Sequence, residues 1–249
     1  MISAVIIARD EANNIARCIQ SLLPVADEIL VLDTGSNDNT RAIAEAAGAA
    51  THAVTWQGYA ATKNEGYTRA RYDYILSLDA DEALSETLQK AILNQKSSLR
   101  GAYSFNRLTF YGEKAVRHCG WYPDVKVRLF HTKEAKWEGA FVHETLILKE
   151  GVEKTHLKGD LLHYSIKNKQ DHIARAKQYA QLAGQKMHAQ GKRYSWLKAH
   201  ASPLARFIRM YMFKGGFLDG AVGWKVCWIS AKAVYWRYQA LRDNATSIH

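Results

Sequence analysis

The first third of the chain alternates short apolar runs with segments of helical spacing, and no other feature limits the possible folds as strongly. Strands that alternate with helices of about ten residues form right-handed βαβ units. The pattern therefore predicts an α/β fold of the Rossmann-like kind, with a mainly parallel sheet covered by helices on both faces. The apolar runs predicted as strands are residues 2–8, 28–33, 51–56 and 74–78.

Acidic and other polar side chains follow three of these predicted strands. Arg9 and Glu11 come after the first strand, Asp33 after the second, and Asp79 and Asp81 after the fourth. Ligands of open parallel sheets bind beyond the carboxyl ends of the strands. We therefore expect these side chains to meet at one edge of the sheet and to form the binding site.

The stretch YILSLDADEAL, residues 74–84, runs an apolar strand directly into three carboxylates, those of Asp79, Asp81 and Glu82. Carboxylates without counter-charges are costly at a buried strand end, because each is partly desolvated beside the other. Mg²⁺ or Mn²⁺ would resolve this, since such cations take one or two carboxylates together with substrate phosphates. The alternative is an ordinary helix N-terminus, where acidic residues complement the helix dipole.

Asp33 opens the stretch DTGSNDNT and has two possible roles. It can accept hydrogen bonds from a nucleobase or a ribose at the sheet edge, or it can stabilise a turn and helix start, which Asp38 or Asn39 could do alone. Neither a G-x-G-x-x-G motif after the first strand nor a P-loop motif occurs in the sequence. Phosphate charge would then be met by a metal ion and by cations, for which Lys63 and Arg71 are candidates.

The pattern changes after about residue 100. AYSFNRLTF and VKVRLFH are predicted strands, joined by a segment rich in turn residues and aromatics, and helical periodicity returns near residue 171. We predict one domain over residues 1–166, with a first half over 1–100 and a second half over 101–166. Residues 167–249 are predicted to form a basic helical extension.

Several segments together resemble family 2 glycosyltransferases, which have the GT-A fold. The segments that carry the resemblance span about residues 2–166 and read VIIARDEANNI, ILVLDTGSNDNT, ATKNEGYTRARYDYILSLDADE, GWYPDVKVRLF, WEGAFVHE and LLHYS. The later segments are most similar to the subgroup of lipopolysaccharide inner-core β-1,4-glucosyltransferases. The resemblance implies an inverting transfer of a hexose, in this subgroup glucose from UDP-glucose, to a heptose of the lipopolysaccharide inner core.

The resemblance makes residues 1–166 the catalytic domain, with a nucleotide-sugar-binding half over 1–100 and an acceptor and catalytic half over 101–166. It also implies roles for the residues that bind the donor. Asp33 matches the residue that contacts the nucleobase, and Ala8, Arg9 and Glu11 match the nucleotide pocket after the first strand. The D-x-D pair of the family, which contacts ribose, diphosphate and metal, matches the three residues Asp79, Ala80 and Asp81.

The remaining site residues follow from the same resemblance. His163, in LLHYS, matches a histidine that such enzymes place near the metal, so that Asp81 and His163 are the expected ligands of Mg²⁺ or Mn²⁺. Glu144, in VHE, occupies the position of the catalytic base; many relatives have Glu-Asp there, whereas this chain has Glu144 followed by Thr145, and Asp124, in WYPD, is the second candidate. From the residues alone, Glu144 could equally be a salt-bridged surface residue, and His163 a buried core histidine.

The C-terminal part of the chain combines positive charge with aromatic residues. The formal net charge is +10, of which residues 192–249 contribute +8, from ten Lys and Arg against two Asp. Basic segments with interfacial aromatics suit an anionic membrane surface, and we predict that residues 192–242 bind one. They would also suit nucleic acid, or a helix pair packed on the catalytic domain with a solvated basic face.

These features together predict a cytoplasmic enzyme attached peripherally to the inner face of the bacterial inner membrane, acting on a lipid-linked glycan. No run of 18 uncharged apolar residues occurs, and three cysteines far apart in sequence favour a reducing compartment. A polyprenyl phosphate, another glycan or a protein is the alternative acceptor. A nucleic-acid-binding module is the alternative of another class, but we expect no nucleic-acid partner, since the acidic strand ends would repel phosphate.

Overall fold

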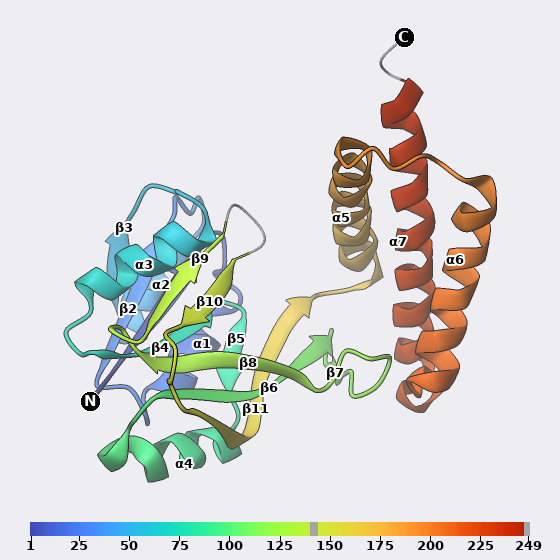
Figure 1. Ribbon diagram of the computed structural model, residues 1–249. Coiled ribbons are helices and arrows are strands. Elements are labelled where there is room, and N and C mark those ends of the chain that lie inside the picture. Colours follow the sequence, from blue (N-terminus) through green and yellow to red (C-terminus); the bar gives the residue numbers. More distant parts are fainter. Residues whose placement is uncertain (140–143, 247–249) are drawn as a thin grey trace. The chain divides into compact units, whose positions relative to one another are not determined.

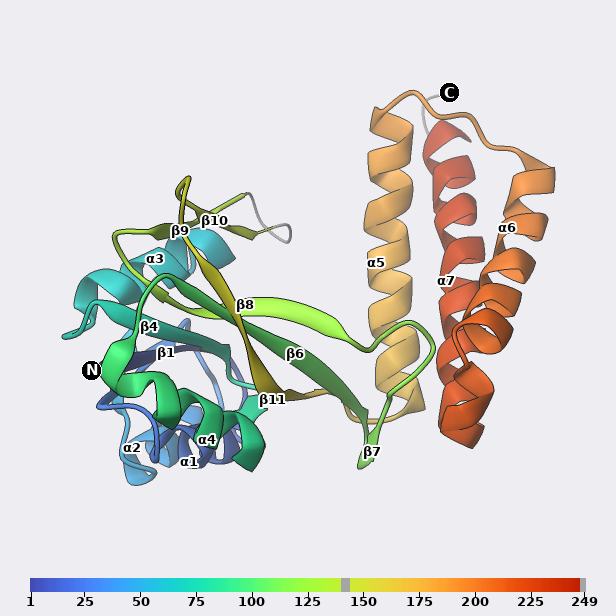
Figure 2. The same ribbon diagram turned by 60° about the horizontal axis from the view of Figure 1, so that its bottom comes forward.

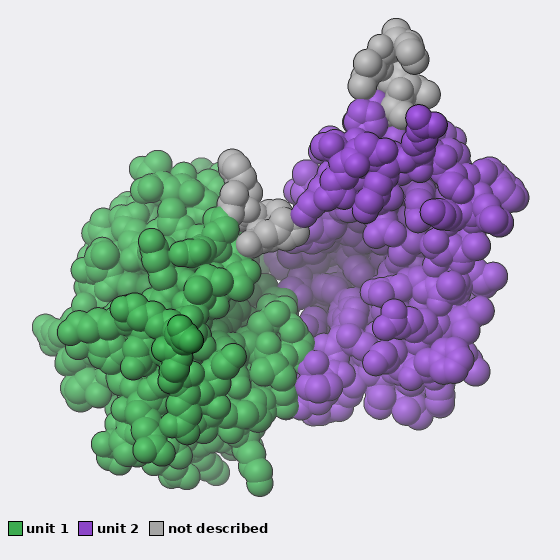
Figure 3. All heavy atoms as spheres, in the orientation of Figure 1, with its two compact units in different colours: residues 1–107, 124–163 green, residues 108–123, 164–249 purple. Residues whose placement is uncertain are grey.

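The computed structural model describes residues 1–139 and 144–246. The chain divides into two compact units, drawn in two colours in Figure 3. Unit 1 consists of residues 1–107 and 124–163, and unit 2 of residues 108–123 and 164–249. Residues 108–123, which the sequence grouped with the catalytic part, thus pack within unit 2.

Unit 1 begins with the alternation of strands and helices expected from the apolar periodicity (Figure 1). Its helices are α1 (Ile15–Leu22), α2 (Thr40–Ala46), α3 (Tyr59–Arg69), α4 (Glu86–Gln95) and the 3₁₀ turn η1 (Lys96–Ser98). Its strands, two of which continue into unit 2, are β1 (Ile2–Ala8), β2 (Glu28–Asp33), β3 (Ala50–Ala53), β4 (Tyr74–Asp79), β5 (Glu82–Leu84), β6 (Ala102–Tyr111), β8 (Asp124–His131), β9 (Ala135–Glu138), β10 (Thr145–Leu148) and β11 (Lys154–Ile166).

The main sheet has the strand order β3-β2-β1-β4-β8-β6-β11-β5. The expected α/β fold is confirmed, and its parallel part is formed by β3, β2, β1 and β4. From β8 onwards the pairs with assigned register are antiparallel, so the whole sheet is mixed. The order of elements along the chain explains this change from parallel to antiparallel pairing. Neighbouring parallel strands need a helical crossover between them, and the helices between strands stop after α4. A separate hairpin pairs β9 with β10.

Helices cover both faces of the parallel strands, which explains why these strands are continuous apolar runs. Figure 2 shows α1, α2 and α4 on one side of the sheet and α3 on the other, together with the β9–β10 hairpin. The two faces form two separate cores, with Ile6 in one and Val5 in the other. On the second face, α3 packs very close to the sheet at Gly66, where a Cβ atom would lie 2.5 Å from Val5 Cγ1.

Unit 2 consists mainly of helices, as expected for the C-terminal extension. Both α5 (Lys169–Ala189) and α6 (Trp196–Ile208) pack against α7 (Gly220–Thr246) (Figures 1 and 2). Cys119 and Cys227, far apart in sequence, are neighbouring free thiols here, with 3.5 Å between their sulfur atoms. The elements of unit 2 are β7 (Lys114–Ala115), α5 (Lys169–Ala189), α6 (Trp196–Ile208), the π-helical turn η2 (Arg209–Phe213), the 3₁₀ turn η3 (Gly216–Asp219) and α7 (Gly220–Thr246).

Among the described residues, no helix combines the length and the apolar composition that a membrane span requires.

Candidate functional site

The register of the parallel strands brings the predicted donor-binding residues to one edge. Ala8, the last residue of β1, pairs with Asp33, the last residue of β2. On the other side of β1, Ile7 pairs with Asp79, the last residue of β4. The three strands therefore end almost level with one another. Asp33 and Asp79 lie at the carboxyl edge of the sheet, on either side of the end of β1.

Asp33 is buried and is held by the loop that follows it. Its Oδ1 atom accepts hydrogen bonds from the backbone N–H of Ser36, at 3.0 Å, and from the Ser36 hydroxyl, at 2.6 Å. Asp38 accepts from the N–H groups of Ala12 and Thr40 and so joins the β1 and β2 loops. The turn-stabilising role that the sequence left open for Asp33 is thus present, and its contact with a nucleobase stays a prediction.

The loop after β1 is fixed to the loop after β2. The backbone N–H of Glu11 donates to Thr40 Oγ1 at 2.8 Å, and the Glu11 carboxylate accepts from Asn14 Nδ2 at 2.8 Å. Arg9 is exposed beside Asp10, with 3.9 Å between their charged groups. The nucleotide-pocket positions named by the resemblance thus lie next to Asp33 on two loops that hold each other.

Asp79 is not a bare carboxylate, because two buried cations hold it. Lys63 Nζ lies 3.2 Å from Asp79 Oδ1, and Arg128 donates to Asp79 Oδ2 at 2.9 Å. Burial by itself would raise the pKa of Asp79, but the charges of Lys63 and Arg128 outweigh it and hold that pKa well below its usual range. The side chain of Lys63 is only 1% exposed, and its ammonium lies 4.3 Å from the Trp137 ring centroid. In this arrangement Lys63 neutralises carboxylates; contact with a phosphate stays a prediction.

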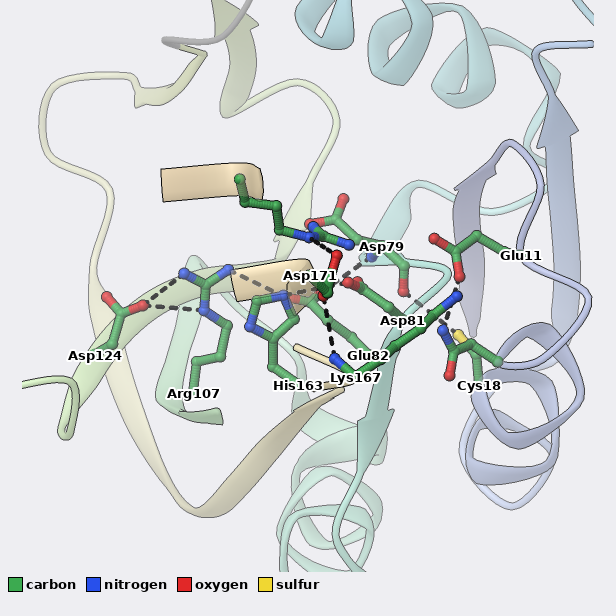
Figure 4. Close-up of polar contacts among 12 residues, drawn as sticks. Glu11, Cys18, Asp79, Asp81, Glu82, Arg107, Asp124, His163, Lys167 and Asp171 are labelled. Atoms are coloured by element: carbon green, nitrogen blue, oxygen red, sulfur yellow. Dashed lines mark hydrogen bonds and ion pairs between the residues drawn. The ribbon is translucent and has the colours of Figure 1, made fainter. Parts of the chain in front are cut away.

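Glu82, the third carboxylate of the strand-end stretch, belongs to the same network (Figure 4). Its side chain is 0% exposed and accepts from Arg128 at 2.7 Å and from the backbone N–H of Asp79 at 3.0 Å. Arg107 Nη1 lies 3.6 Å from the same carboxylate. Two arginines from β6 and β8 therefore balance Glu82 and Asp79. Neither arginine was predicted from the sequence, although Arg107 is the only charged residue of β6 and could have indicated a buried counter-charge.

We expect the substitution Arg128→Met to lower the free energy of unfolding by about 3–5 kcal/mol, because it leaves Glu82 buried without its closest cation. Urea denaturation followed by tryptophan fluorescence measures this. The matched control is Arg100→Met, which removes an exposed pair with Glu153 and should cost under about 1 kcal/mol. Equal losses in the two variants would contradict a special role for the buried network.

Asp81 contacts a different partner. Its Oδ2 atom lies 3.4 Å from His163 Nε2, and the antiparallel register that pairs His163 with Glu82 brings this histidine from β11 to the acidic turn. Figure 4 shows the three residues close together. The structure thus joins the two residues that the sequence named as metal ligands, although they are far apart along the chain.

The donor set of Asp81 and His163 fits a divalent cation that takes its other ligands from a diphosphate. One carboxylate and one imidazole are suitable ligands for Mn²⁺, and Mg²⁺ is commonly held by one or two carboxylates plus phosphate oxygens. No cluster of three or more His, Cys, Asp or Glu with metal-site geometry occurs within residues 1–139 and 144–246. A metal at this position would therefore depend on substrate oxygens.

The two candidates for the catalytic base have different surroundings. Glu144 lies directly before β10, partly buried, with its Oε1 atom 3.6 Å from Lys63 Nζ. Asp124 accepts from Arg107 at 2.7 Å and lies 3.0 Å from Lys126 Nζ. Burial raises the pKa of Asp124, but the hydrogen bond and charge of Lys126 and the charge of Arg107 together lower it. A carboxylate held in this way is a weaker proton acceptor, which favours Glu144.

The positions of Arg71 and Ala80 bear on two predictions made from the sequence. The prediction that Arg71 binds phosphate is wrong. Arg71 precedes β4, and its backbone N–H donates to the carboxylate of Glu28 at the start of β2. It therefore lies at the amino ends of the strands, away from the carboxyl edge. Ala80 is buried between Asp79 and Asp81, and its contact with the donor stays a prediction. Residues 140–143, within the motif that precedes Glu144, lie outside the described residues.

Comparison with known proteins assigns the family. The model of the family described as glycosyl transferase family 2 matches residues 3–152. The chain belongs to glycosyl transferase family 2. An uncharacterized glycosyltransferase of Rickettsia bellii is 30% identical over 254 residues, which cover 97% of this chain and 86% of that protein. This family 2 glycosyltransferase is therefore an enzyme that transfers a sugar from a nucleotide-sugar donor.

Two further relatives differ in how much of this glycosyltransferase they cover. The lipopolysaccharide core biosynthesis glycosyltransferase LpsC of Rhizobium meliloti is 25% identical over 258 residues, or 95% of this chain and 93% of LpsC. The solved structure of glucosyl-3-phosphoglycerate synthase from Mycobacterium tuberculosis, in complex with Mn²⁺, UDP and phosphoglyceric acid, is 23% identical and covers 45% of this chain and 43% of that one. Its TM-score is 0.37, so it adds nothing to the family assignment.

Proposed function

We propose that this enzyme transfers a hexose, most simply glucose, from a UDP-sugar to a lipid-linked glycan of the lipopolysaccharide inner core, with inversion at the anomeric carbon. The observation that carries the proposal is the meeting of Asp81 with His163, from β11, at the strand edge where Asp33 and Asp79 end. A nucleotide at this edge would have carboxylates for its base and ribose, and a carboxylate–imidazole pair beside its diphosphate.

The donor would be bound by residues from several strand ends. Asp33, which accepts from Ser36, would also accept from a nucleobase or ribose, and Ala8, Arg9 and Glu11 would line the adjoining part of the nucleotide pocket. Asp81 and His163 would hold Mg²⁺ or Mn²⁺, which supplies positive charge against the charge that builds on the departing diphosphate. Asp79, held by Lys63 and Arg128, contributes a fixed acceptor for ribose hydroxyls.

Glu144 would accept the proton of the acceptor hydroxyl as its oxygen attacks the anomeric carbon opposite the diphosphate. General base assistance of this kind contributes about 10²–10⁴ in rate. Lys63 lies between Glu144 and Asp79, at 3.6 Å and 3.2 Å from their carboxylate oxygens. The same ammonium therefore positions the base relative to the donor site.

The name of LpsC supports a lipopolysaccharide acceptor. A polyprenyl phosphate, another glycan or a protein would use the same donor chemistry. A transfer screen that pairs labelled UDP-sugars with a bacterial lipid extract distinguishes these acceptors by the class of molecule that takes up the label.

We expect UDP and Mn²⁺ together to raise the Tm of the protein by several degrees, and each alone to have a smaller effect, because the cation joins the diphosphate to Asp81 and His163. A ligand at 100 times its Kd stabilises the folded state by about 2.7 kcal/mol. Differential scanning fluorimetry measures the shift. Stabilisation by an oligonucleotide alone, with none by UDP and Mn²⁺, would contradict the proposal and favour a nucleic-acid-binding module.

We also propose peripheral attachment to an anionic membrane, at the inner face of the bacterial inner membrane, through residues 192–242. Support comes from exposed apolar side chains at the η2 and η3 turns, among them Phe213, which is 81% exposed, and Leu218, which is 62% exposed. Exposed cations such as Lys225 accompany them. Apolar side chains beside cations are typical of interfacial binding.

We expect the protein to float with phosphatidylglycerol vesicles at low salt, and less so at high salt, because salt screens the charges. The double substitution Phe213→Ser and Leu218→Ser should reduce flotation severalfold. Leu93→Ser, which changes an exposed leucine of unit 1, is the matched control. Absence of flotation at low salt would exclude this mode of attachment.

A further inference from the structure

Unit 2 contains an open groove that the helices leave unfilled. It has a volume of about 620 Å³ and lies over α7, with α5 and α6 as its walls. Small side chains, such as Ala180, Ala183 and Ala233, form much of its lining. Because α5 and α6 pack against α7 (Figures 1 and 2), the groove is built by three helices of one unit.

Three arginines line this groove, and none of the described residues that line it carries a carboxylate. The arginines are Arg206 from α6, Arg209 from η2 and Arg237 from α7. The Nε atom of Arg237 is buried and has no hydrogen-bond partner among the described residues. Buried donors of this kind are nearly always satisfied in folded proteins, so an acceptor from outside the chain would complete the site.

A second hollow, also of about 620 Å³, shares Ala183 and Arg237 with the groove. Its lining adds the four cations Lys186, Lys192, Arg193 and Lys198. Within the described part of the chain, it again includes no Asp or Glu. Like charges gathered without counter-charges repel one another, which costs stability unless an anion neutralises them. The two hollows together form a continuous cationic surface, which we call the arginine groove.

We propose that the arginine groove binds the phosphate group of a membrane lipid or lipid-linked glycan. The planar guanidinium group of Arg matches phosphate oxygens in a bidentate manner, and three arginines line this groove. The small apolar lining accepts hydrocarbon, and the exposed Phe213 and Leu218 belong to the same unit. An amphiphile with an anionic phosphate head satisfies both the charge and the apolar surface, whereas free phosphate satisfies only the charge.

The test measures binding of dioctanoyl phosphatidic acid to the full chain by isothermal titration calorimetry. Inorganic phosphate and dioctanoylglycerol are the two comparison ligands, since one lacks the acyl chains and the other lacks the phosphate. The groove variant carries Arg206→Gln, Arg209→Gln and Arg237→Gln. The control carries Lys114→Gln, Lys169→Gln and Lys177→Gln, three exposed lysines of unit 2 that line neither hollow and lie outside residues 192–242.

We expect the Kd for phosphatidic acid to rise at least tenfold in the groove variant and less than twofold in the control. Equal weakening in both variants would overturn the proposal, because it would reflect net charge alone. Equally tight binding of dioctanoylglycerol would overturn the claim that the groove recognises a phosphate group. Equally tight binding of inorganic phosphate would overturn the claim that this phosphate belongs to a lipid. Displacement of the lipid by a short oligonucleotide at lower concentration would assign the groove to nucleic acid instead.

A second variant and a readout that is independent of sugar transfer keep the test decisive. If the groove variant melts early because Arg237 is partly buried, the double variant Arg206→Gln and Arg209→Gln changes only exposed side chains, and the same outcomes apply to it. The measurement needs neither donor nor sugar transfer. Failure at the arginine groove would therefore leave the proposed transferase chemistry standing, and failure of transfer would leave the groove result intact.

Discussion

The substitution Asp81→Asn should reduce sugar transfer by at least roughly 10³-fold, because it removes the carboxylate of the pair that we propose to hold a metal beside the diphosphate. Lewis-acid stabilisation of a leaving group is worth several kcal/mol, and each 1.36 kcal/mol is about tenfold in rate. Asparagine keeps the shape of the side chain, so the fold should survive. Transfer from a labelled UDP-sugar measures the loss.

Binding provides a second measurement for the same variant. Asp81→Asn should lose the part of the UDP-induced Tm shift that requires Mn²⁺, and His163→Gln should lose much of it. The control is Asp73→Asn, which alters an exposed carboxylate just before β4, at the other end of the strand from Asp79. Turnover near that of the wild type in Asp81→Asn would remove the metal assignment.

The substitution Glu144→Gln should reduce transfer by about 10²–10⁴-fold while UDP affinity is retained, because a proton acceptor is lost and the donor contacts are not. Lys63 keeps its closer partner, Asp79, at 3.2 Å, so the buried network should persist. Single-turnover transfer, together with UDP binding by calorimetry, separates the two effects.

Asp124→Asn is the decisive comparison for the base. Asp124 is held by Arg107 and Lys126, which together lower its pKa despite its burial. We therefore expect only a modest loss of transfer, accompanied by some loss of stability because Arg107 loses a partner. If Asp124→Asn abolishes transfer with UDP binding intact, and Glu144→Gln does not, Asp124 is the base.

Much of unit 1 could be predicted because its signals are local. The apolar runs that became β1, β2 and β4 and the helices between them follow from periodicity, which neighbouring residues set by themselves. The gathering of Asp33 and Asp79 at one edge follows from the topology of parallel strands. The part of unit 2 at residues 108–123 was not predicted, because such segments are placed by contacts with helices much later in the chain.

The buried ion pairs were the main feature that sequence patterns did not reveal. From the sequence, the carboxylates of the strand-end stretch were expected to be unpaired, with a metal balancing their charge. In the structure, Arg128 and Lys63 neutralise Asp79, and Arg107 and Arg128 hold Glu82. Only Asp81, beside His163, remains suited to a metal, so one of the three carboxylates rather than two carries that proposal.

The amino-acid sequence by itself determined the α/β alternation, the acidic strand ends, the basic C-terminal segment and the family motifs. Each of these depends on residues that lie close together along the chain. Only the tertiary structure decided that His163 meets Asp81, that Lys63 joins Asp79 to Glu144, and that three helices surround the arginine groove. The physical reason is that such contacts depend on strand register and helix packing between segments distant in sequence, which the burial of the whole core selects.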